Sequence, residues 1–442
     1  MQSNFTDNEY NSRLEALFTR FQSVQKVGFK DGAYKPGLGG MQKLDALLGH
    51  PWKAYPCIHV AGTNGKGSVC SMLASALAAG CGGRRQADGQ CRGRIGLYTS
   101  PHLLDFRERI KVVSDSGAEM ISRADVWEFL ERYEAEFEGL SFFEITTGMA
   151  FWWFARKGVD AAVIEVGLGG RLDSTNIITP ALSVVTSIGL DHCALLGNTR
   201  AEIAREKAGI FKAGVPAVVG SRDMETTSVF EETAASVGCP LLFADNVPAF
   251  PIENEILSKM DLTGPCQEMN LHTALCALDV LGAVEEESAT AAITQTACRT
   301  GLRGRWETIS RNPETICDIG HNPPALKENF SRLEALQAKG RRLIIIYGIM
   351  ADKDLAGIAP LMPAGARYIF TAPDNQRSLP AEELKTRLEA LRPDLFSSYK
   401  PETAGSVTLA VQRARELAQD LPDALIYIGG STFVVAEAIP QF

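Results

Sequence analysis

The chain has 442 residues, 45% of them hydrophobic and 22% charged, with a formal net charge of −9. This length exceeds one ordinary core, so two domains are expected. No apolar run approaches the ~20 residues that span a bilayer, residues 1–20 are unlike a secretory signal, and the negative charge argues against nucleic acid. We therefore expect a cytoplasmic protein with small-molecule partners, no nucleic-acid or membrane partner, and a monomeric state by default.

The ten cysteines are scattered along the chain, and none forms a C-x-x-C pair. Several lie in apolar segments, as Cys57 and Cys317 do. Reduced, buried thiols are therefore a better interpretation than disulfides or a zinc site.

Short apolar runs alternate with helical stretches in the first part of the chain. A strand is predicted over 57–61, a helix over 68–79, and an exposed Gly- and Arg-rich loop over 81–94. A further helix is predicted over 122–137, and further strands over 95–99, 161–166, 182–188 and 216–220. Val- and Ile-rich strands separated by helices indicate a mostly parallel sheet covered on both faces.

The alternation restarts after "GLRGR" (301–305), a candidate hinge. A helix is predicted over 324–337, and strands over 315–320, 342–349, 367–372 and 424–430. The expected fold is α/β: an N-terminal P-loop-type domain with a mostly parallel sheet over 1–303, and a smaller Rossmann-like α/β domain over 304–442.

The stretch "AGTNGKGS" (61–68) joins the first strand to the first helix. It departs from the standard P-loop because Val60 stands five residues before Gly65 and Gly67 separates the lysine from the serine. Its glycines still allow tight turns, its backbone N–H groups and a helix N-terminus face an anion, and its lysine can reach a terminal phosphate. We predict a phosphate-binding loop made of Gly62, Thr63, Asn64, Gly65, Lys66, Gly67 and Ser68.

Polar residues also end the next strands of this sheet, where open α/β sheets bind ligands. Their hydroxyl, carboxylate and imidazole groups suit a Mg²⁺ ion that keeps some waters; they are Ser100, Glu165 and His192. The alternatives are a structural turn at Ser100, a hydrogen-bonded structural histidine, and a buried pair between Glu165 and an arginine such as Arg171.

Lys207 follows a capping-box signature, Thr199 with Glu202, which predicts a helix start near residue 200. The lysine lies on the apolar side, where burial would favour its neutral amine, and a neutral amine can take up CO₂ as a metal-binding carbamate. From the residues alone, a lysine that reaches solvent or pairs with Glu202 is favoured. The nearby "EVGLGGRLDSTN" (165–176) fails the dinucleotide pattern at Leu172 and is more typical of a mobile loop that covers a ligand.

Taken together, motifs along nearly the whole chain resemble the folylpolyglutamate synthase / dihydrofolate synthase family of Mur-type amide ligases. The matching stretches are "VAGTNGKGSV" (60–69), "YTSPHLLDFRERI" (98–110), "FFEITTGMAF" (142–151), "EVGLGGRLDSTN" (165–176), "VTSIGLDH" (185–192), "EKAGIFK" (206–212), "GRW" (304–306), "DIGHNP" (318–323), "GIMADKD" (348–354) and "GGSTFVV" (429–435). The chain departs from the family pattern in its longer 81–94 stretch and in Ser68, where many relatives carry Thr.

The resemblance implies an ATP-dependent ligase that joins L-glutamate to a folate or dihydropteroate carboxylate through an acyl phosphate. It implies that Gly62 to Ser68 hold the phosphates of ATP, that Ser100 and Glu165 bind one Mg²⁺, and that His192 and carbamylated Lys207 bind a second metal. It also implies that the ATP contacts include Asn270, Arg305, Asp318 and His321. The nucleotide would then lie between the domains, with Lys66, Lys207 and His192 in catalytic roles.

Two other functions compete with this expectation. A Mur-type ligase with a different carboxylate and amino acid would keep the fold, but the folate-type motifs beyond the phosphate loop count against it. A P-loop ATPase acting through a protein partner is disfavoured by the second α/β domain and by the absence of a strict Walker A sequence.

Overall fold

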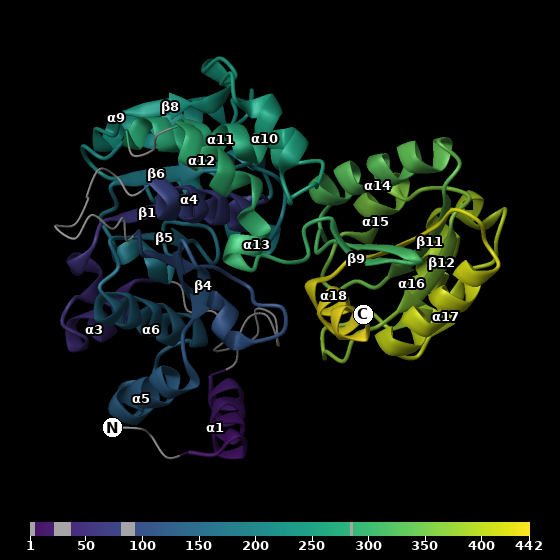
Figure 1. The fold of residues 1–442 in the computed structure, drawn as a ribbon, viewed down its shortest axis with the longest axis horizontal. Helices are drawn as coiled ribbons and strands as arrows, with labels where there is room; N and C mark the ends of the chain where they lie inside the picture. The colour runs from purple at the N-terminus through teal and green to yellow at the C-terminus, as the bar shows by residue number, and fades with distance from the viewer. Residues whose placement is uncertain (1–4, 22–36, 81–92, 283–285) are drawn as a thin grey trace. The chain divides into compact units, whose positions relative to one another are not determined.

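The computed structural model describes residues 5–21, 37–80, 93–282 and 286–442. They form two compact units: Met1–Asp261 with Gln267–Leu302, and Leu262–Cys266 with Arg303–Phe442 (Figure 1). Nothing in the sequence indicated that the short segment Leu262–Cys266 belongs with the second unit. Most of the predicted 81–94 loop, residues 81–92, lies outside the described residues.

The first unit is built on an eight-stranded sheet with the order β4-β3-β2-β5-β1-β6-β7-β8 among the described residues. Its strands are β1 (Cys57–Ala61), β2 (Ile95–Tyr98), β3 (Ile110–Ser114), β4 (Gly117–Met120), β5 (Ala161–Glu165), β6 (Leu182–Val185), β7 (Ala217–Val219) and β8 (Leu241–Phe243). All pairs are parallel except β2–β3 and β3–β4. Every residue of β1 and β6 is buried, as expected for central parallel strands.

The helices of the first unit that matter most for the site are α4 (Lys66–Gly80), α8 (Arg200–Ala208) and α11 (Gln267–Leu281). The others are α1 (Asp7–Arg20), α3 (Gly39–Leu47), α5 (Arg123–Tyr133), α6 (Phe142–Lys157), α7 (Cys193–Leu196), α9 (Thr227–Val237), α10 (Glu253–Lys259), α12 (Glu286–Thr294) and α13 (Thr296–Thr300). Helix α4 is buried on almost every face because it packs between the sheet and α11 and α12. Its all-round apolar sequence follows from that position.

The second unit has its own six-stranded sheet with the order β13-β12-β11-β14-β10-β9. Its strands are β9 (Glu307–Arg311), β10 (Glu314–Cys317), β11 (Arg342–Tyr347), β12 (Arg367–Thr371), β13 (Glu402–Ala404) and β14 (Ala424–Gly429), and only β9 pairs antiparallel. Its helices are α14 (Pro323–Ala338), α15 (Leu355–Ile358), α16 (Ala381–Leu391), α17 (Val407–Gln419) and α18 (Thr432–Ala438).

The predicted α/β architecture with two mostly parallel sheets is confirmed. The strand predicted over 57–61 matches β1, the other predicted strands extend one to three residues beyond the observed ends, and the first helix begins at Lys66 instead of residue 68. The hairpin of β3 and β4 was not predicted, and β4 is an edge strand without buried residues, so it lacks an apolar signal.

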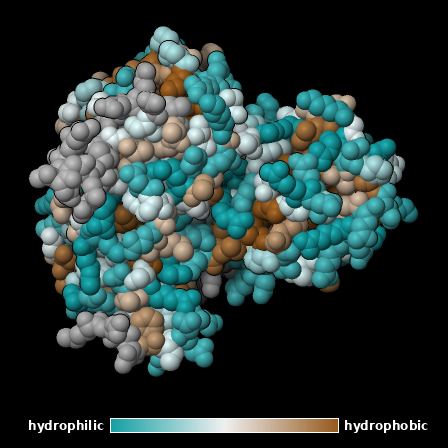
Figure 2. All heavy atoms as spheres, in the orientation of Figure 1, coloured by the Kyte–Doolittle hydropathy of each residue, from teal (hydrophilic) through white to brown (hydrophobic). Residues whose placement is uncertain are grey.

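Five of the described cysteines are buried, Cys193 is half-buried, and Cys266 and Cys298 are exposed, so burial holds for most but not all of them. Among the described residues, no helix is long and apolar enough to cross a membrane. Hydrophilic residues cover most of the face of each unit that Figure 2 shows.

Helix α6 depends on a buried capping box. The Ser141 side chain accepts a hydrogen bond from the Glu144 N–H, and the Glu144 carboxylate accepts from the Ser141 N–H and Oγ, at 2.7 and 2.8 Å. We expect Ser141→Ala to lower the free energy of unfolding of the first unit by about 1–2 kcal/mol because it removes this cap and one donor to the carboxylate. Urea unfolding followed by tryptophan fluorescence measures the loss, since α6 carries Trp152 and Trp153.

The matched control is Ser258→Ala, at an exposed serine in α10 whose hydroxyl only donates to the Glu255 carbonyl. We expect that variant to unfold as the wild type does. Equal midpoints for Ser141→Ala and the wild type would contradict the role assigned to the cap.

Candidate active site

The loop after β1 makes two turns that require glycine. Gly62 and Gly65 have φ angles of 151° and 86°, in the region that side chains disfavour. A Cβ on Gly62 would collide with the Thr186 hydroxyl, and one on Gly65 would collide with the Asn270 amide oxygen. The loop therefore runs in close contact with the end of β6 on one side and with α11 on the other.

Hydrogen bonds from the segment after β6 hold this loop in place. The Thr63 N–H donates to the Ser187 carbonyl at 2.7 Å. The Thr63 hydroxyl accepts from the Gly189 N–H at 3.0 Å and donates to the Gly189 carbonyl at 3.1 Å. The Asn64 carbonyl accepts from the hydroxyls of Thr186 and Ser187, at 2.6 and 3.1 Å. The loop shape is thus fixed by the protein's own contacts.

Two lysines converge on one carbonyl oxygen of the loop. Lys66 Nζ donates to the Gly62 oxygen at 3.1 Å and to the Thr63 oxygen at 3.3 Å, and Lys207 Nζ donates to the Gly62 oxygen at 2.9 Å. The capping box of Thr199 and Glu202 starts α8 at Arg200 as predicted, and the helix then carries Lys207 to this point.

Lys207 is only 4% exposed, so the alternative of a lysine reaching solvent is wrong. Glu202 does not pair with it, because its carboxylate accepts from the Asn198 and Thr199 N–H groups. Burial, reinforced by the positive charge of Lys66, lowers the pKa of Lys207 to about 7, although Asp191 and Asp173 act in the opposite direction. A substantial share of neutral amine at this lysine near neutral pH follows from its position.

Glu165, the last residue of β5, is buried and accepts a hydrogen bond from the Ser100 N–H at 2.9 Å. The alternative partner Arg171 is wrong, because Arg171 pairs with Glu206 at 2.9 Å. Burial lowers the pKa of Arg109, and the negative charge of Glu165 opposes this lowering. Arg109 in turn donates from Nε to His102 Nδ1 at 2.8 Å.

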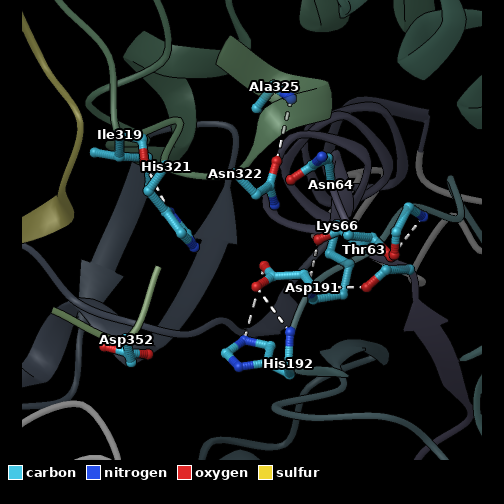
Figure 3. A network of polar contacts seen from close by, with 12 residues as sticks. Thr63, Asn64, Lys66, Asp191, His192, Ile319, His321, Asn322, Ala325 and Asp352 are labelled. Atoms are coloured by element: carbon cyan, nitrogen blue, oxygen red, sulfur yellow. Dashed lines mark hydrogen bonds and ion pairs between the residues drawn. The ribbon is translucent and has the colours of Figure 1, made fainter. Parts of the chain in front are cut away.

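His192 follows β6 and has a left-handed backbone with φ 52°. Its N–H donates to the Asp191 carboxylate at 2.9 Å, and its ring Nε2 lies 3.8 Å from the same group. Figure 3 shows this pair in the same close-up as Thr63 and Lys66 of the loop. Asp191 is not among the predicted site residues, yet its charge raises the pKa of Lys207.

Asn270 lies one turn inside α11, because that helix begins at Gln267. Its side chain donates to the Gln267 amide oxygen at 3.0 Å, and Gln267 donates to the Ser68 hydroxyl at 3.4 Å. Gln267 was missed, since a glutamine at a helix start carries no distinctive signal.

The glycine-rich segment after β5 is anchored by a fully buried carboxylate. Asp173 accepts from the Leu168 and Thr175 N–H groups and from the Thr175 hydroxyl, which also contacts His59 Nε2 at 2.8 Å. Burial lowers the pKa of His59 to about 3, so this histidine is neutral. Sequence reasoning missed His59 because it lies inside a strand that otherwise reads as apolar core.

The remaining three predicted residues belong to the second unit, near the end of β10. The Asp318 carboxylate accepts from the N–H groups of Trp306 and Gly320 and from Asn329 Nδ2, at 2.7 to 2.8 Å, and burial raises its pKa. Arg305 donates to the carbonyls of Arg303 and Gly304, and His321 Nδ1 donates to the Ile319 carbonyl. Figure 3 also shows His321 and Asn322, the residue that caps α14.

The structure gathers the predicted residues of the first unit at the carboxyl ends of β1, β2, β5 and β6. Electrostatic effects link them: Glu165 and Lys66 both act on Cys70, and Lys66 and Asp191 both act on Lys207. No group of three or more His, Cys, Asp or Glu side chains that could hold a metal occurs in the described part of the chain. Mg²⁺ usually takes one or two carboxylates and completes its shell with water and phosphate, and Glu165 offers one buried carboxylate.

The comparison with protein families gives a match to the second unit. The family "Mur ligase, glutamate ligase domain" matches residues 304–432. The chain is 37% identical to the dihydrofolate synthase/folylpolyglutamate synthase of Escherichia coli over 362 residues, which cover 80% of this chain and 81% of that protein. It is 33% identical to a probable bifunctional folylpolyglutamate synthase/dihydropteroate synthase of Haloferax volcanii, which matches 97% of this chain, while the chain spans about half (50%) of that protein.

Solved structures resemble the whole chain. The Mycobacterium tuberculosis folylpolyglutamate synthase complexed with ADP superposes with a TM-score of 0.80 at 27% identity, covering 98% of both chains. Escherichia coli FolC in complex with DHPP and ADP gives 0.77 at 28% identity, covering 98% and 97%. The Yersinia pestis bifunctional enzyme complexed with AMPPNP and Mn gives 0.76 at 27% identity with the same coverage. The chain belongs to the folylpolyglutamate synthase / dihydrofolate synthase family.

Proposed function

We propose that the protein is an ATP-dependent amide ligase that joins L-glutamate to the carboxylate of a folate or dihydropteroate, with ADP and phosphate as the other products. The observation that carries this proposal is the phosphate loop with Lys66 and Lys207 on the Gly62 carbonyl, beside the Ser100–Glu165 contact. The ADP, AMPPNP, Mn and DHPP named for the solved relatives support it.

The loop would hold the phosphates of ATP through backbone N–H groups and the start of α4. Lys66 would exchange its contacts with the Gly62 and Thr63 carbonyls for a phosphate oxygen. MgATP supplies the phosphoryl group that converts the substrate carboxylate into an acyl phosphate, which the neutral amine of glutamate then attacks. The protein contributes positioning and charge neutralisation, the main catalytic effects in phosphoryl transfer.

The proposal includes two binding sites for divalent cations. Ser100 and Glu165 would bind one Mg²⁺, and His192 with a carbamylated Lys207 would bind a second. Support for the carbamate comes from the buried position of Lys207 and its lowered pKa, since only a neutral amine adds CO₂.

In the second unit, the proposed ATP contacts are Arg305, Asp318 and His321, and Asn270 is proposed for the first. We retain 1–303 and 304–442 as the functional domains, and a cytoplasmic location is part of the same proposal. The buried carboxylate of Asp318 supports the proposed ATP contacts indirectly. It accepts hydrogen bonds from the Trp306 and Gly320 N–H groups and so fixes the backbone next to Arg305 and His321.

The direct assay is phosphate release from MgATP. We expect release to require both L-glutamate and either dihydropteroate or tetrahydrofolate. Dependence on a different carboxylate or amine would favour a Mur-type ligase with other substrates. Release that needs neither would favour a P-loop ATPase and contradict the proposal.

Lys66→Ala should lower kcat by about 10²- to 10³-fold, because it removes a cation aimed at the charge that develops on the transferred phosphoryl group. Steady-state phosphate release measures the effect. Lys259→Ala is the matched control: this lysine of α10 is exposed and pairs with Glu255 at 2.8 Å. Full activity in Lys66→Ala, or an equal loss in both variants, would contradict the role of Lys66.

Lys207 predicts a pH dependence of stability. Its pKa is about 7 in the folded protein and near 10.5 when unperturbed, so between these values the unfolded chain binds a proton that the folded protein does not. Stability therefore rises with pH in this window, by at most about 1.4 kcal/mol per pH unit from this group. Relative to Lys207→Met, the wild type should gain free energy of unfolding as the pH rises from 7 to 9 in CO₂-free buffer, as urea titrations would measure. A difference that stays constant with pH would refute the lowered pKa.

A further inference from the structure

A pocket of about 200 Å³ lies in the second unit, and none of the residues that line it is among the site residues proposed above. Its walls come from the last turn of α14, the amino ends of β11 and β12, and the segment before β13. Because β10, β11 and β12 run parallel, this is the sheet edge opposite to Asp318, which follows the carboxyl end of β10.

The lining of this pocket is strongly basic. It includes Arg341, Arg342 and Arg367, together with Tyr399 and Gln337. No aspartate or glutamate lines it among the residues that the structure describes. In a chain with a net charge of −9, a concave site with three arginines is a local reversal of charge.

One of the three arginines is already neutralised. Arg341 pairs with Glu314 at 2.6 Å and donates to the carbonyls of Asp423 and Ala424, which ties the amino ends of β10 and β14 together. Arg341 is therefore a structural part of the wall.

The guanidinium groups of the other two arginines are not neutralised by a carboxylate of the described residues and can bind an anion. Arg342 is exposed and forms no ion pair with the described residues. The Arg367 guanidinium lies over the Tyr399 ring, with 4.4 Å from Cζ to the ring centroid, and its buried Nε has no hydrogen-bond partner in the part of the chain described. Like Arg342, Arg367 forms no ion pair with the described residues, so both positive charges remain available to an anion in the pocket.

We propose that this pocket binds a small oxyanion carrying at least two negative charges. Arginine forks match the geometry of phosphate and carboxylate groups, and stacking on Tyr399 fixes the plane of the Arg367 fork. The volume of about 200 Å³ accommodates a diphosphate or a short polycarboxylate. The site is independent of the proposed ligase reaction.

Calorimetric titration of the full chain tests the proposal in a Lys66→Ala background, so that the phosphate loop contributes little. One arm uses inorganic pyrophosphate and the other γ-linked diglutamate, both at constant ionic strength. Binding in at least one arm is expected, and the arm that binds identifies the source of the oxyanion. Arg342→Gln and Arg367→Gln should each weaken it about tenfold or more, since each removes a charged donor.

Arg387→Gln is the matched control, because this arginine of α16 is exposed and pairs with Glu383 outside the pocket. It should bind as the background does. The side chain of Arg342 is exposed, so its variant keeps the test valid even if Arg367→Gln does not fold. Absence of binding in both arms, unchanged binding in Arg342→Gln, or equal weakening in Arg387→Gln would overturn the proposal.

Discussion

The turn of the chain after β1 is the constraint on which the site depends. Two glycines in the left-handed region let the backbone pass against Thr186 on one side and Asn270 on the other. The Gly62 carbonyl that this turn exposes then accepts hydrogen bonds from both Lys66 and Lys207. A side chain at Gly62 would collide with Thr186 at the end of β6, and one at Gly65 would collide with Asn270 of α11.

The charged side chains buried around this turn are stabilised by neighbouring protein groups instead of by solvent. Lys207 is buried near a second lysine, and its charged form is therefore disfavoured, while Asp191 and Asp173 offset part of the cost. Asp173 itself is saturated with donors from its own loop. This arrangement leaves a share of neutral amine near neutral pH beside the Gly62 carbonyl, and perturbed pKa values of this kind cluster at functional sites.

The sequence predicted the parts of the fold that carry strong periodic signals. Central strands such as β1 and β6 are buried on both faces and read as continuous apolar runs, and the capping box at Thr199 fixed the start of α8. The edge strand β4 and the start of α11 at Gln267 were not predicted, because an exposed strand and a glutamine carry little local signal for secondary structure. The polar residues at strand ends were found since topology brings those ends to one edge. The burial of Lys207 and the pairing of Arg171 with Glu206 depend on packing between distant segments, which a single sequence does not reveal.

The central claim is that the phosphoryl group held by this loop passes to a substrate carboxylate and not to water. The most direct test uses dihydropteroate or tetrahydrofolate labelled with ¹⁸O in the acceptor carboxylate, with MgATP and L-glutamate, and follows the released phosphate by the ¹⁸O isotope shift in its ³¹P spectrum. In an acyl phosphate route, one carboxylate oxygen becomes the bridging oxygen and leaves with the phosphate when the amine attacks, so the phosphate should carry the label. Unlabelled phosphate released together with amide product would contradict the account.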